Sequence, residues 1–300
     1  MQREILLTGS SGLIGRAMTR ALTAAGYAVR GLDPAAEAPA ERGDVRDARR
    51  VSAAVGACEG VVHLGAVSRV VWGERDPIAC EAVNVGGTRN VLAAAAAAPA
   101  RPWVIVASSR EVYGQADALP VTEDAPLRPM NAYGRSKAAA EALTLAAARA
   151  GVRAAVVRLS NVYGSAVDHP DRVVPAFARA AARGGAIRVE GADRLFDFTH
   201  VDDVARGLTA LVARLRAGDV PPPIHFVSGE GTTLGALAAL AGALAGAAPP
   251  IVEAAPREYD VARFCGDPAR AMDLLGWRAA VPLREGLSRL IASHRADAAT

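Results

Sequence analysis

The sequence predicts an α/β protein with a doubly wound parallel (Rossmann) sheet and a smaller, partly interleaved C-terminal substrate lobe. Short apolar runs of strand length alternate with helical segments through the first half of the chain. The first run ends in a glycine-rich loop that opens a helix, as in dinucleotide-binding units. We expect residues 1–164 to form the Rossmann domain, with later returns near 196–229, and residues 165–300 to form mainly the substrate lobe.

Each element of this fold has its own signal. Strands are expected where buried apolar runs occur, at residues 4–7, 27–32, 60–64, 103–107, 152–159 and 224–227. Helices are expected at residues 13–25, 78–98 and 133–150. Each helix is followed by a residue that does not continue a helix well, namely Gly26, Pro99 and Gly151.

The composition excludes several classes of protein. The 300 residues are 51% hydrophobic and 22% charged, which excludes a disordered chain. The net charge is only +3 and aromatic residues make up 4%, so we expect no nucleic-acid partner. The five histidines and three cysteines show no metal-ligand spacing, and we expect no metal. The odd, scattered cysteines and the lack of a secretory signal layout predict a cytoplasmic protein.

A stretch without charge between Glu230 and Glu253 is long enough to span a bilayer. It consists mostly of alanine and glycine, and Pro249 and Pro250 interrupt it. Its leucines recur at helical spacing on one face, at positions 234, 237, 240 and 244. We therefore predict an ordinary core-facing helix and no membrane partner.

The glycine loop Thr8–Gly15 predicts a cofactor site. Glycines at positions 9, 12 and 15 let backbone amides approach a pyrophosphate, and the following helix N-terminus favours its charge. Asp33 ends the second strand, where a carboxylate binds the ribose 2′-hydroxyl of NAD and would repel the extra phosphate of NADP. We expect NAD as the cofactor.

Tyr133 and Lys137 lie four residues apart at the start of a helix, so their side chains share one face. A nearby ammonium is expected to lower the tyrosine pKa. Such a tyrosine can remove a proton from a substrate hydroxyl while hydride leaves the adjacent carbon. Ser109 follows a buried strand and is expected at the carboxyl edge of the sheet, where it could bond the reacting oxygen.

Several ordered motifs give the chain a resemblance to a known family. They are TGSSGLIG at 8–15, GDVRD at 43–47, VVHLGAVS at 61–68, NVGGTRNVL at 84–92, ASSREVYG at 107–114, YGRSK at 133–137, RLSNVYG at 158–164, FDFTHVDDVARG at 196–207 and LLGW at 274–277. The chain resembles the extended short-chain dehydrogenases/reductases of the NAD-dependent nucleotide-sugar epimerase and dehydratase group. The resemblance covers nearly the whole chain.

The resemblance implies a role for each matching residue. The implied catalytic residues are Ser109, Tyr133, Lys137 and Glu111. The implied cofactor-binding residues, besides Tyr133 and Lys137, are Gly9, Ser11, Gly12, Leu13, Ile14, Gly15, Asp33, Asp44, Val45, Leu64, Gly65, Ala66 and Asn84. The implied substrate-binding residues are Ser68, Asn161, Val173, Pro175, Arg194, Arg257 and Asp260.

The chain departs from this family's usual pattern at three places. Phe196 stands where many relatives carry a phosphate-binding arginine, so either Arg194 substitutes or the diphosphate is held differently. The 4,6-dehydratases usually carry Asp-Glu after the catalytic serine or threonine, as acid and base for water elimination, whereas this chain has Arg110-Glu111. Trp72 stands where smaller residues are commoner, which indicates either a reshaped sugar pocket or simple packing.

We therefore expect a nucleotide-sugar epimerase, similar to UDP-glucose 4-epimerase, that transiently oxidises the sugar at position 4. The alternatives are a nucleotide-sugar 4,6-dehydratase, decarboxylase or 4-ketoreductase. A non-catalytic NAD(P)-binding sensor is less favoured, because such relatives tend to lose the Tyr-Lys pair. The resemblance also implies a homodimer, in which the helices at 85–98 and 133–150 pack into a four-helix bundle.

Overall fold

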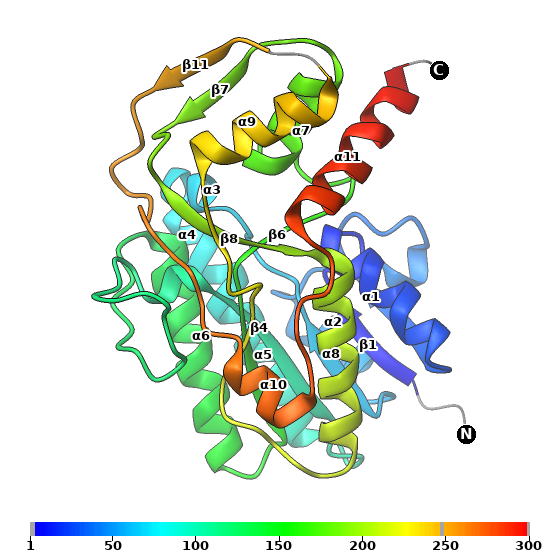
Figure 1. Cartoon of the computed structure of the whole chain (residues 1–300). Coiled ribbons are helices and arrows are strands. Elements are labelled where there is room, and N and C mark those ends of the chain that lie inside the picture. Colours follow the sequence, from blue (N-terminus) through cyan, green and yellow to red (C-terminus); the bar gives the residue numbers. More distant parts are fainter. Residues whose placement is uncertain (1–3, 247–248, 299–300) are drawn as a thin grey trace.

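The computed structural model describes residues 4–246 and 249–298 (Figure 1). Its centre is a parallel sheet of six strands in the order β2-β1-β3-β4-β5-β9. These strands are β1 (Glu4–Thr8), β2 (Ala28–Leu32), β3 (Gly60–His63), β4 (Trp103–Ser109), β5 (Ala154–Leu159) and β9 (Ile224–Phe226). All six apolar runs thus form strands, and the predicted doubly wound fold is confirmed.

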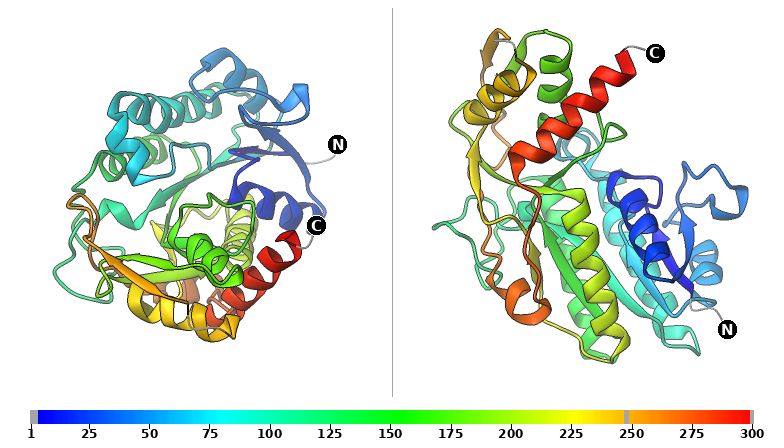
Figure 2. Two further views of the ribbon diagram at one scale, coloured as in Figure 1. Left: turned by 90° about the horizontal axis from the view of Figure 1, so that it is seen from above. Right: turned by 45° about the vertical axis from the view of Figure 1, so that its right-hand side comes forward.

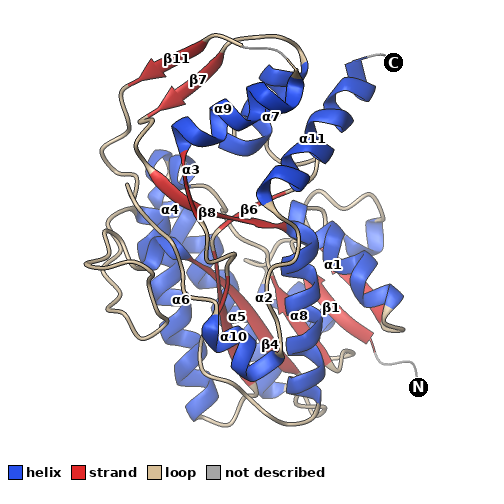
Figure 3. Ribbon diagram, in the orientation of Figure 1, coloured by secondary structure: helices blue, strands red, loops and turns tan. Residues whose placement is uncertain are grey.

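Helices cover both faces of this sheet (Figure 3). On one face lie α1 (Leu13–Ala24) and α8 (Val201–Arg216), and on the other lie α2 (Ala48–Val55), α5 (Gly87–Ala97) and α6 (Ala132–Arg149). Successive residues of a strand point to opposite faces. In β1, Ile5 and Leu7 accordingly join the core beneath α1 and α8, while Leu6 joins the core beneath the other three helices.

The helix predicted at residues 78–98 is divided into three parts. Between α4 (Pro77–Glu81) and α5 lies a π-helical segment, Ala82–Gly86. Insertions of this kind re-aim side chains and often mark functional sites. Asn84 lies in the segment and is buried. A short helix, α3 (Val70–Arg75), precedes this group.

A second group of elements lies beyond one end of the sheet (Figure 2). It contains α7 (Val173–Ala182), α9 (Leu234–Ala245), α11 (Leu283–Ala298) and the two-stranded sheet of β7 (Ile187–Glu190) and β11 (Ile251–Ala254). Their apolar faces form a core of their own, centred on Phe177, Leu237 and Leu287. Our division of the chain near residue 164 remains a prediction.

A three-stranded sheet connects the two groups. It consists of β6 (Asn161–Tyr163), β8 (Leu195–His200) and β10 (Gly231–Thr233). From β8 the chain runs directly into α8, where the His200 side chain accepts a hydrogen bond from Asp202 N and so caps the helix. The last short helix, α10 (Ala269–Leu275), lies near β9.

The charge-free stretch forms α9, which Thr233 caps and Gly246 ends in the left-handed conformation. Leu234 and Leu237 are buried, as expected of a core-facing helix. Residues 247 and 248 of that stretch lie outside the described residues. Within the described part of the chain, no helix is long and apolar enough to cross a membrane.

Candidate active site

A cleft of about 1100 Å³ lies at the carboxyl edge of the central sheet, and residues of both groups of elements line it. Parallel α/β sheets bind ligands at this edge. The cleft brings together nearly all of the residues that the sequence singled out, among them Gly9, Tyr133 and Asp260. Ser11 and Asn84 are the two that lie beside it rather than in its lining.

The glycine loop has the shape that a pyrophosphate requires. Gly9 has φ +70°, and a Cβ there would lie 2.8 Å from Gly65 N. A Cβ on Gly15 would lie 2.2 Å from Gly9 O, so these two glycines allow the helix and strand to pack closely. Gly12 meets only one atom, at 3.4 Å, and its backbone lines the open cleft. The loop therefore fits a dinucleotide, with Leu13 and Ile14 beside it.

Asp33 directly follows β2 and lines the cleft. One of its carboxylate oxygens accepts a hydrogen bond from Ser11 N at 3.1 Å, and the other from Ala35 N at 2.8 Å. Ser11 thereby orients Asp33. Asp44 and Val45 also line the cleft, and a bidentate contact with Arg46 lowers the pKa of Asp44.

A chain of hydrogen bonds supports the loop that carries Leu64, Gly65 and Ala66. Gly65 N donates to Thr8 Oγ1 at 3.0 Å, and Thr8 Oγ1 lies 2.7 Å from His63 Nδ1. His63 Nε2 lies 3.2 Å from Thr88 Oγ1, which donates to Asn84 O at 2.6 Å. Burial lowers the pKa of His63 to about 3, so the ring stays neutral.

Ser109, Tyr133 and Lys137 meet because the start of α6 packs on the turn that follows β4. Asn131 caps α6 by accepting from Gly134 N at 2.7 Å. A Cβ on Gly134 would lie 2.6 Å from Glu111 O, so only glycine permits this approach. Ser109 ends β4 and hydrogen-bonds the Tyr133 hydroxyl. The three predicted catalytic side chains therefore share one part of the cleft.

The predicted direction of the tyrosine pKa is wrong for this structure. Burial raises the pKa of Tyr133 to about 12, and the hydrogen bond from Ser109 only partly opposes it. Lys137 Nζ donates to Ala107 O at 2.9 Å and lies 5.9 Å from the centre of the Tyr133 ring. Burial lowers the pKa of Lys137 to about 8, which weakens the ammonium that was expected to act on the phenol.

Glu111 is buried and fully engaged. Its Oε1 forms an ion pair of 2.9 Å with Arg110 Nη2, and its Oε2 accepts from Asn131 Nδ2 at 2.7 Å. The guanidinium of Arg110 also lies over the ring of Phe196, 4.5 Å from its centre. The two positions at which a dehydratase would carry its acid and base thus form an internal ion pair.

The cleft lining includes all of the residues that were predicted to bind the substrate, namely Ser68, Asn161, Val173, Pro175, Arg194, Arg257 and Asp260. Arg194 lies in the cleft, but its donors are used by the chain: Nη1 donates to Asp260 O at 3.2 Å and Nη2 to Arg257 O at 2.9 Å. Arg257 Nε pairs with Asp260 at 2.8 Å. Of the two alternatives for the missing arginine, this geometry favours a diphosphate that is held differently.

Sequence reasoning missed several cleft residues. Three arginines also line the cleft: Arg172 from the loop before α7, Arg179 from α7 and Arg188 from β7. They lie outside the quoted motifs, and only the folded chain brings them to the site. Trp72 also lines the cleft, where its ring lies edge-on to His169 with 4.6 Å between ring centres.

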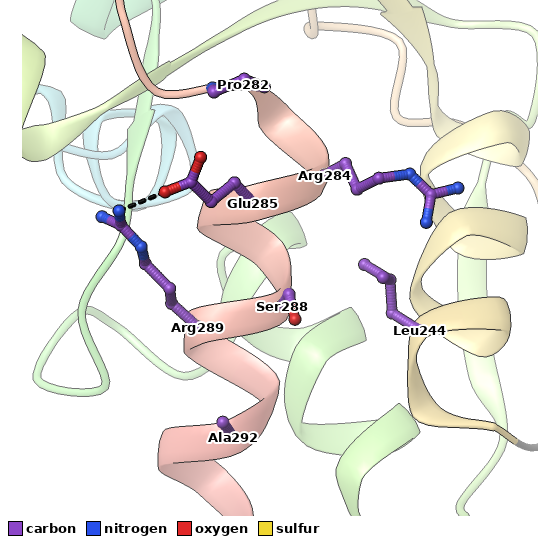
Figure 4. Close-up of a pocket in the computed structure, with 7 residues that line it drawn as sticks. All are labelled: Leu244, Pro282, Arg284, Glu285, Ser288, Arg289 and Ala292. Atoms are coloured by element: carbon purple, nitrogen blue, oxygen red, sulfur yellow. Dashed lines mark hydrogen bonds and ion pairs between the residues drawn. The ribbon is translucent and has the colours of Figure 1, made fainter.

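A second hollow lies between α9 and α11 (Figure 4). Leu244 faces it from α9, and Glu285 pairs with Arg289 on the α11 side. None of the predicted site residues lines this hollow. The described residues hold no cluster of histidine, cysteine, aspartate or glutamate that could bind a metal.

The fold and the cleft define an enzyme of the Rossmann class that uses a dinucleotide. The model of the NAD dependent epimerase/dehydratase family matches residues 5–227, and the chain belongs to this family. It is an NAD-dependent enzyme.

Individual relatives have different activities. The chain is 33% identical to a dTDP-glucose 4,6-dehydratase of Streptomyces griseus, over 97% of this chain and 94% of the relative. It is 30% identical to a UDP-glucose 4-epimerase of Mycolicibacterium smegmatis, over 97% and 98%. It is also similar to the solved structure of MoeE5 in complex with UDP-glucose and NAD, with 29% identity, coverage of 98% and 99%, and a TM-score of 0.89.

Proposed function

We propose that the protein is a nucleotide-sugar epimerase that oxidises the sugar transiently at position 4. The observation that carries this proposal is the Arg110–Glu111 ion pair of 2.9 Å. Elimination of water needs an acid that protonates the leaving hydroxyl and a base that removes the neighbouring proton. A guanidinium does not release its proton at any physiological pH. Glu111 is held by Arg110 and Asn131, so neither part of the elimination machinery is free.

The residues of the cleft suit reversible oxidation. NAD, when bound, would supply a reversible hydride acceptor at carbon 4. Between the two transfers the 4-keto sugar must turn over in the cleft, so that hydride returns to its other face and the hydroxyl is inverted. Tyr133 takes the proton of the 4-hydroxyl and later gives it back, while Ser109 donates a hydrogen bond to the reacting oxygen. Ser109 is oriented for this task, because its Oγ also accepts from Glu111 N at 3.2 Å. Lys137, fixed on Ala107 O at 2.9 Å, supplies positive charge next to the tyrosine when it is protonated.

In this proposal the cofactor is bound by the glycine loop and by Asp33, Asp44 and Val45. Their positions in the lining of the cleft support this assignment. Leu64, Gly65 and Ala66 contact its ribose and pyrophosphate. Arg257 and Arg179 face the diphosphate of the substrate, since Arg194 is committed to backbone carbonyls.

We also propose a homodimer built on α5 and α6. Small residues on the outward face of these helices, among them Ala93, Ala96, Ala139, Ala142 and Ala146, are exposed. Such residues let helices approach closely. A monomer in light scattering at micromolar concentration would contradict this assembly.

We further propose a cytoplasmic location, which the three buried cysteines support because none of them forms a disulfide.

The decisive experiment incubates the purified protein with NAD and a panel of UDP- and dTDP-sugars. An epimerase gives a product of unchanged mass with an inverted hydroxyl, read by NMR. The alternatives differ in mass: a dehydratase product has lost water and a decarboxylase product has lost carbon dioxide. A 4-ketoreductase, which runs in reverse with NAD, gives a 4-keto sugar that has lost two hydrogens, together with NADH. Tyr133→Phe should lower kcat by roughly 10²- to 10⁴-fold with unchanged NAD affinity. Loss of water from any sugar of the panel would refute the proposal.

A further inference from the structure

Arg188 and Glu190 form an ion pair on the face of β7 that lines the cleft. Alternate residues of a strand point to the same side, and on the opposite side of β7 Ile187 and Val189 are buried in the core of the second group. Arg188 Nε lies 3.4 Å from Glu190 Oε1. Acceptors and donors therefore lie side by side at this place in the wall of the cleft.

Both side chains of this ion pair are accessible and have unused hydrogen-bonding groups. The exposed fraction is 37% for Glu190 and 70% for Arg188. The Glu190 carboxylate has two charged neighbours, Arg188 at 3.4 Å and Arg257 at 3.8 Å, but among the described residues it accepts no hydrogen bond. Within the same part of the chain, the Nη nitrogens of Arg188 donate none. A ligand in the cleft can therefore reach two carboxylate oxygens and a guanidinium together.

The position of β7 places this ion pair near the nucleoside of a bound substrate. In the proposed function, Ser109 and Tyr133 hold the sugar at the end of β4. The strand β7 forms a separate small sheet with β11, and Figure 1 shows both strands in the second group, away from β4. Glu190 Oε2 lies 3.8 Å from Nε of Arg257, which faces the diphosphate in that proposal. The ion pair thus lies beyond the diphosphate, on the side of the base.

Apolar side chains next to the ion pair suit the flat faces of a base. Val173 and Pro175, at the start of α7, line the cleft, and α7 packs against β7. Leu234, at the start of α9, lines the cleft as well. Sites for such ligands combine apolar contact with a few polar groups that fix orientation and specificity. We therefore assign the edge of the base to Arg188 and Glu190.

The order of donors and acceptors decides which base fits this pair. Guanine presents two adjacent donors, N1–H and the N2 amino group, next to the acceptor O6. A carboxylate can accept from both donors with its two oxygens, while a neighbouring guanidinium donates to O6. Uracil and thymine present a single N–H between two carbonyl oxygens, so a carboxylate meets one donor and a repelling acceptor. Adenine and cytosine also place an acceptor, an unprotonated ring nitrogen, beside the amino group.

We propose that the preferred substrate is a sugar linked to guanosine diphosphate, and that Glu190 and Arg188 recognise its guanine. The two oxygens of Glu190 accept from N1–H and the N2 amino group, and Arg188 donates to O6. This inference rests on the proposed function for the direction in which the substrate lies in the cleft. Glu190 is then a specificity-determining residue that contacts neither the sugar nor NAD.

The test measures the affinities of GDP and UDP by isothermal titration of the protein saturated with NAD. For the wild type we expect GDP to bind at least tenfold more tightly, because a bidentate contact discriminates strongly between base edges. Glu190→Gln keeps the size of the side chain but presents one acceptor and one donor, which match the adjacent N3–H and O4 of uracil. It should lower the ratio of GDP to UDP affinity at least tenfold. Arg188→Met removes the donor to O6 and should lower the ratio too.

Glu253→Gln serves as the matched control. It makes the same change at an exposed glutamate of β11 that does not line the cleft, and it should leave the ratio as in the wild type. A wild-type ratio below ten overturns the proposal. So does a Glu190→Gln variant that weakens both nucleotides equally, which is the result expected of a carboxylate that binds the ribose.

These affinities are independent of the reaction that follows binding. If a nucleotide sugar is epimerised and GDP is not favoured over UDP, only this inference fails. If a sugar loses water, the proposed epimerase function fails, and the ratio of affinities still decides which base the protein prefers.

Discussion

The side chain of Asn84 donates a hydrogen bond of 2.8 Å to Ser136 Oγ, one residue before Lys137. The same amide donates to Val67 O at 3.1 Å, and its Oδ1 accepts from Val67 N at 2.8 Å. One buried asparagine thus joins the loop after β3 to the helix that carries Tyr133 and Lys137. The π-helical turn at Ala82–Gly86 presents Asn84 to both partners.

This link predicts the effect of Asn84→Ala. The variant should bind NAD about tenfold more weakly, because it loses the two hydrogen bonds that hold Val67 in the loop and the one that ties them to α6. Each is worth roughly 1 kcal/mol, and a tenfold loss of affinity is about 1.4 kcal/mol. Isothermal titration with NAD measures the change. Thr144→Val removes a buried hydroxyl that bonds only Ala140 O within α6, and it serves as the matched control. Equal NAD affinity in the two variants would show that Asn84 does not position the loop.

The negative charge of Asp33 leads us to expect that the protein binds NAD more tightly than NADP. Its carboxylate lies in the cleft and would repel the additional phosphate of NADP. Asp33→Asn keeps a similar shape and an acceptor for Ser11 N, but removes the charge. We expect the NADP/NAD affinity ratio to rise at least tenfold in this variant. Titration with both cofactors measures the ratio, and an unchanged ratio would rule out charge repulsion by Asp33.

The motifs allowed the sequence to predict the strands to within two residues, and nearly all of the predicted site residues line the cleft, because both depend on local patterns. The roles of individual charges depended on contacts between distant segments. Arg194 bonds the carbonyls of Arg257 and Asp260, more than sixty positions away in the chain. Arg110 lies over Phe196, from a separate sheet. The pKa of Lys137 is set by burial, which no four-residue spacing encodes.

A buried ion pair behind the active site predicts a large effect on stability. Arg158 of β5 bonds both carboxylate oxygens of Glu141 on α6, with Nη2 at 2.7 Å, and these side chains are 5% and 1% exposed. Glu141 also accepts from Ser108, the neighbour of Ser109. Arg158→Met leaves a buried carboxylate unpaired and should lower the free energy of unfolding by about 3–5 kcal/mol.

The double variant Arg158→Met/Glu141→Leu tests whether the lost stability comes from the unpaired carboxylate of Glu141. Because no charge remains buried, most of the lost stability should return. Urea denaturation of the wild type, both single variants and the double variant gives the coupling free energy. If the effects of the single variants simply add, the two residues do not stabilise each other.

The burial of Lys137 should make the free energy of unfolding depend on pH in the protein without cofactor. Burial lowers the pKa of Lys137 from 10.5 to about 8, so between these values the unfolded chain binds more protons than the folded one. Stability from this group therefore rises as pH increases from 8 to 10.5. Below pH 8 the charged amine is buried at a cost of about 3 kcal/mol, since one pKa unit corresponds to about 1.4 kcal/mol.

Lys137→Met should therefore be more stable than the wild type at pH 7, and this advantage should shrink by pH 10, although the variant loses turnover. Urea denaturation at the two pH values measures the difference. Lys137 is the only lysine of the chain, so reductive methylation with ¹³C-formaldehyde gives a lysine NMR signal that the variant identifies by its absence. That signal should titrate near pH 8. An advantage of the variant that is equal at both pH values would mean that packing, and not the buried charge, determines its stability.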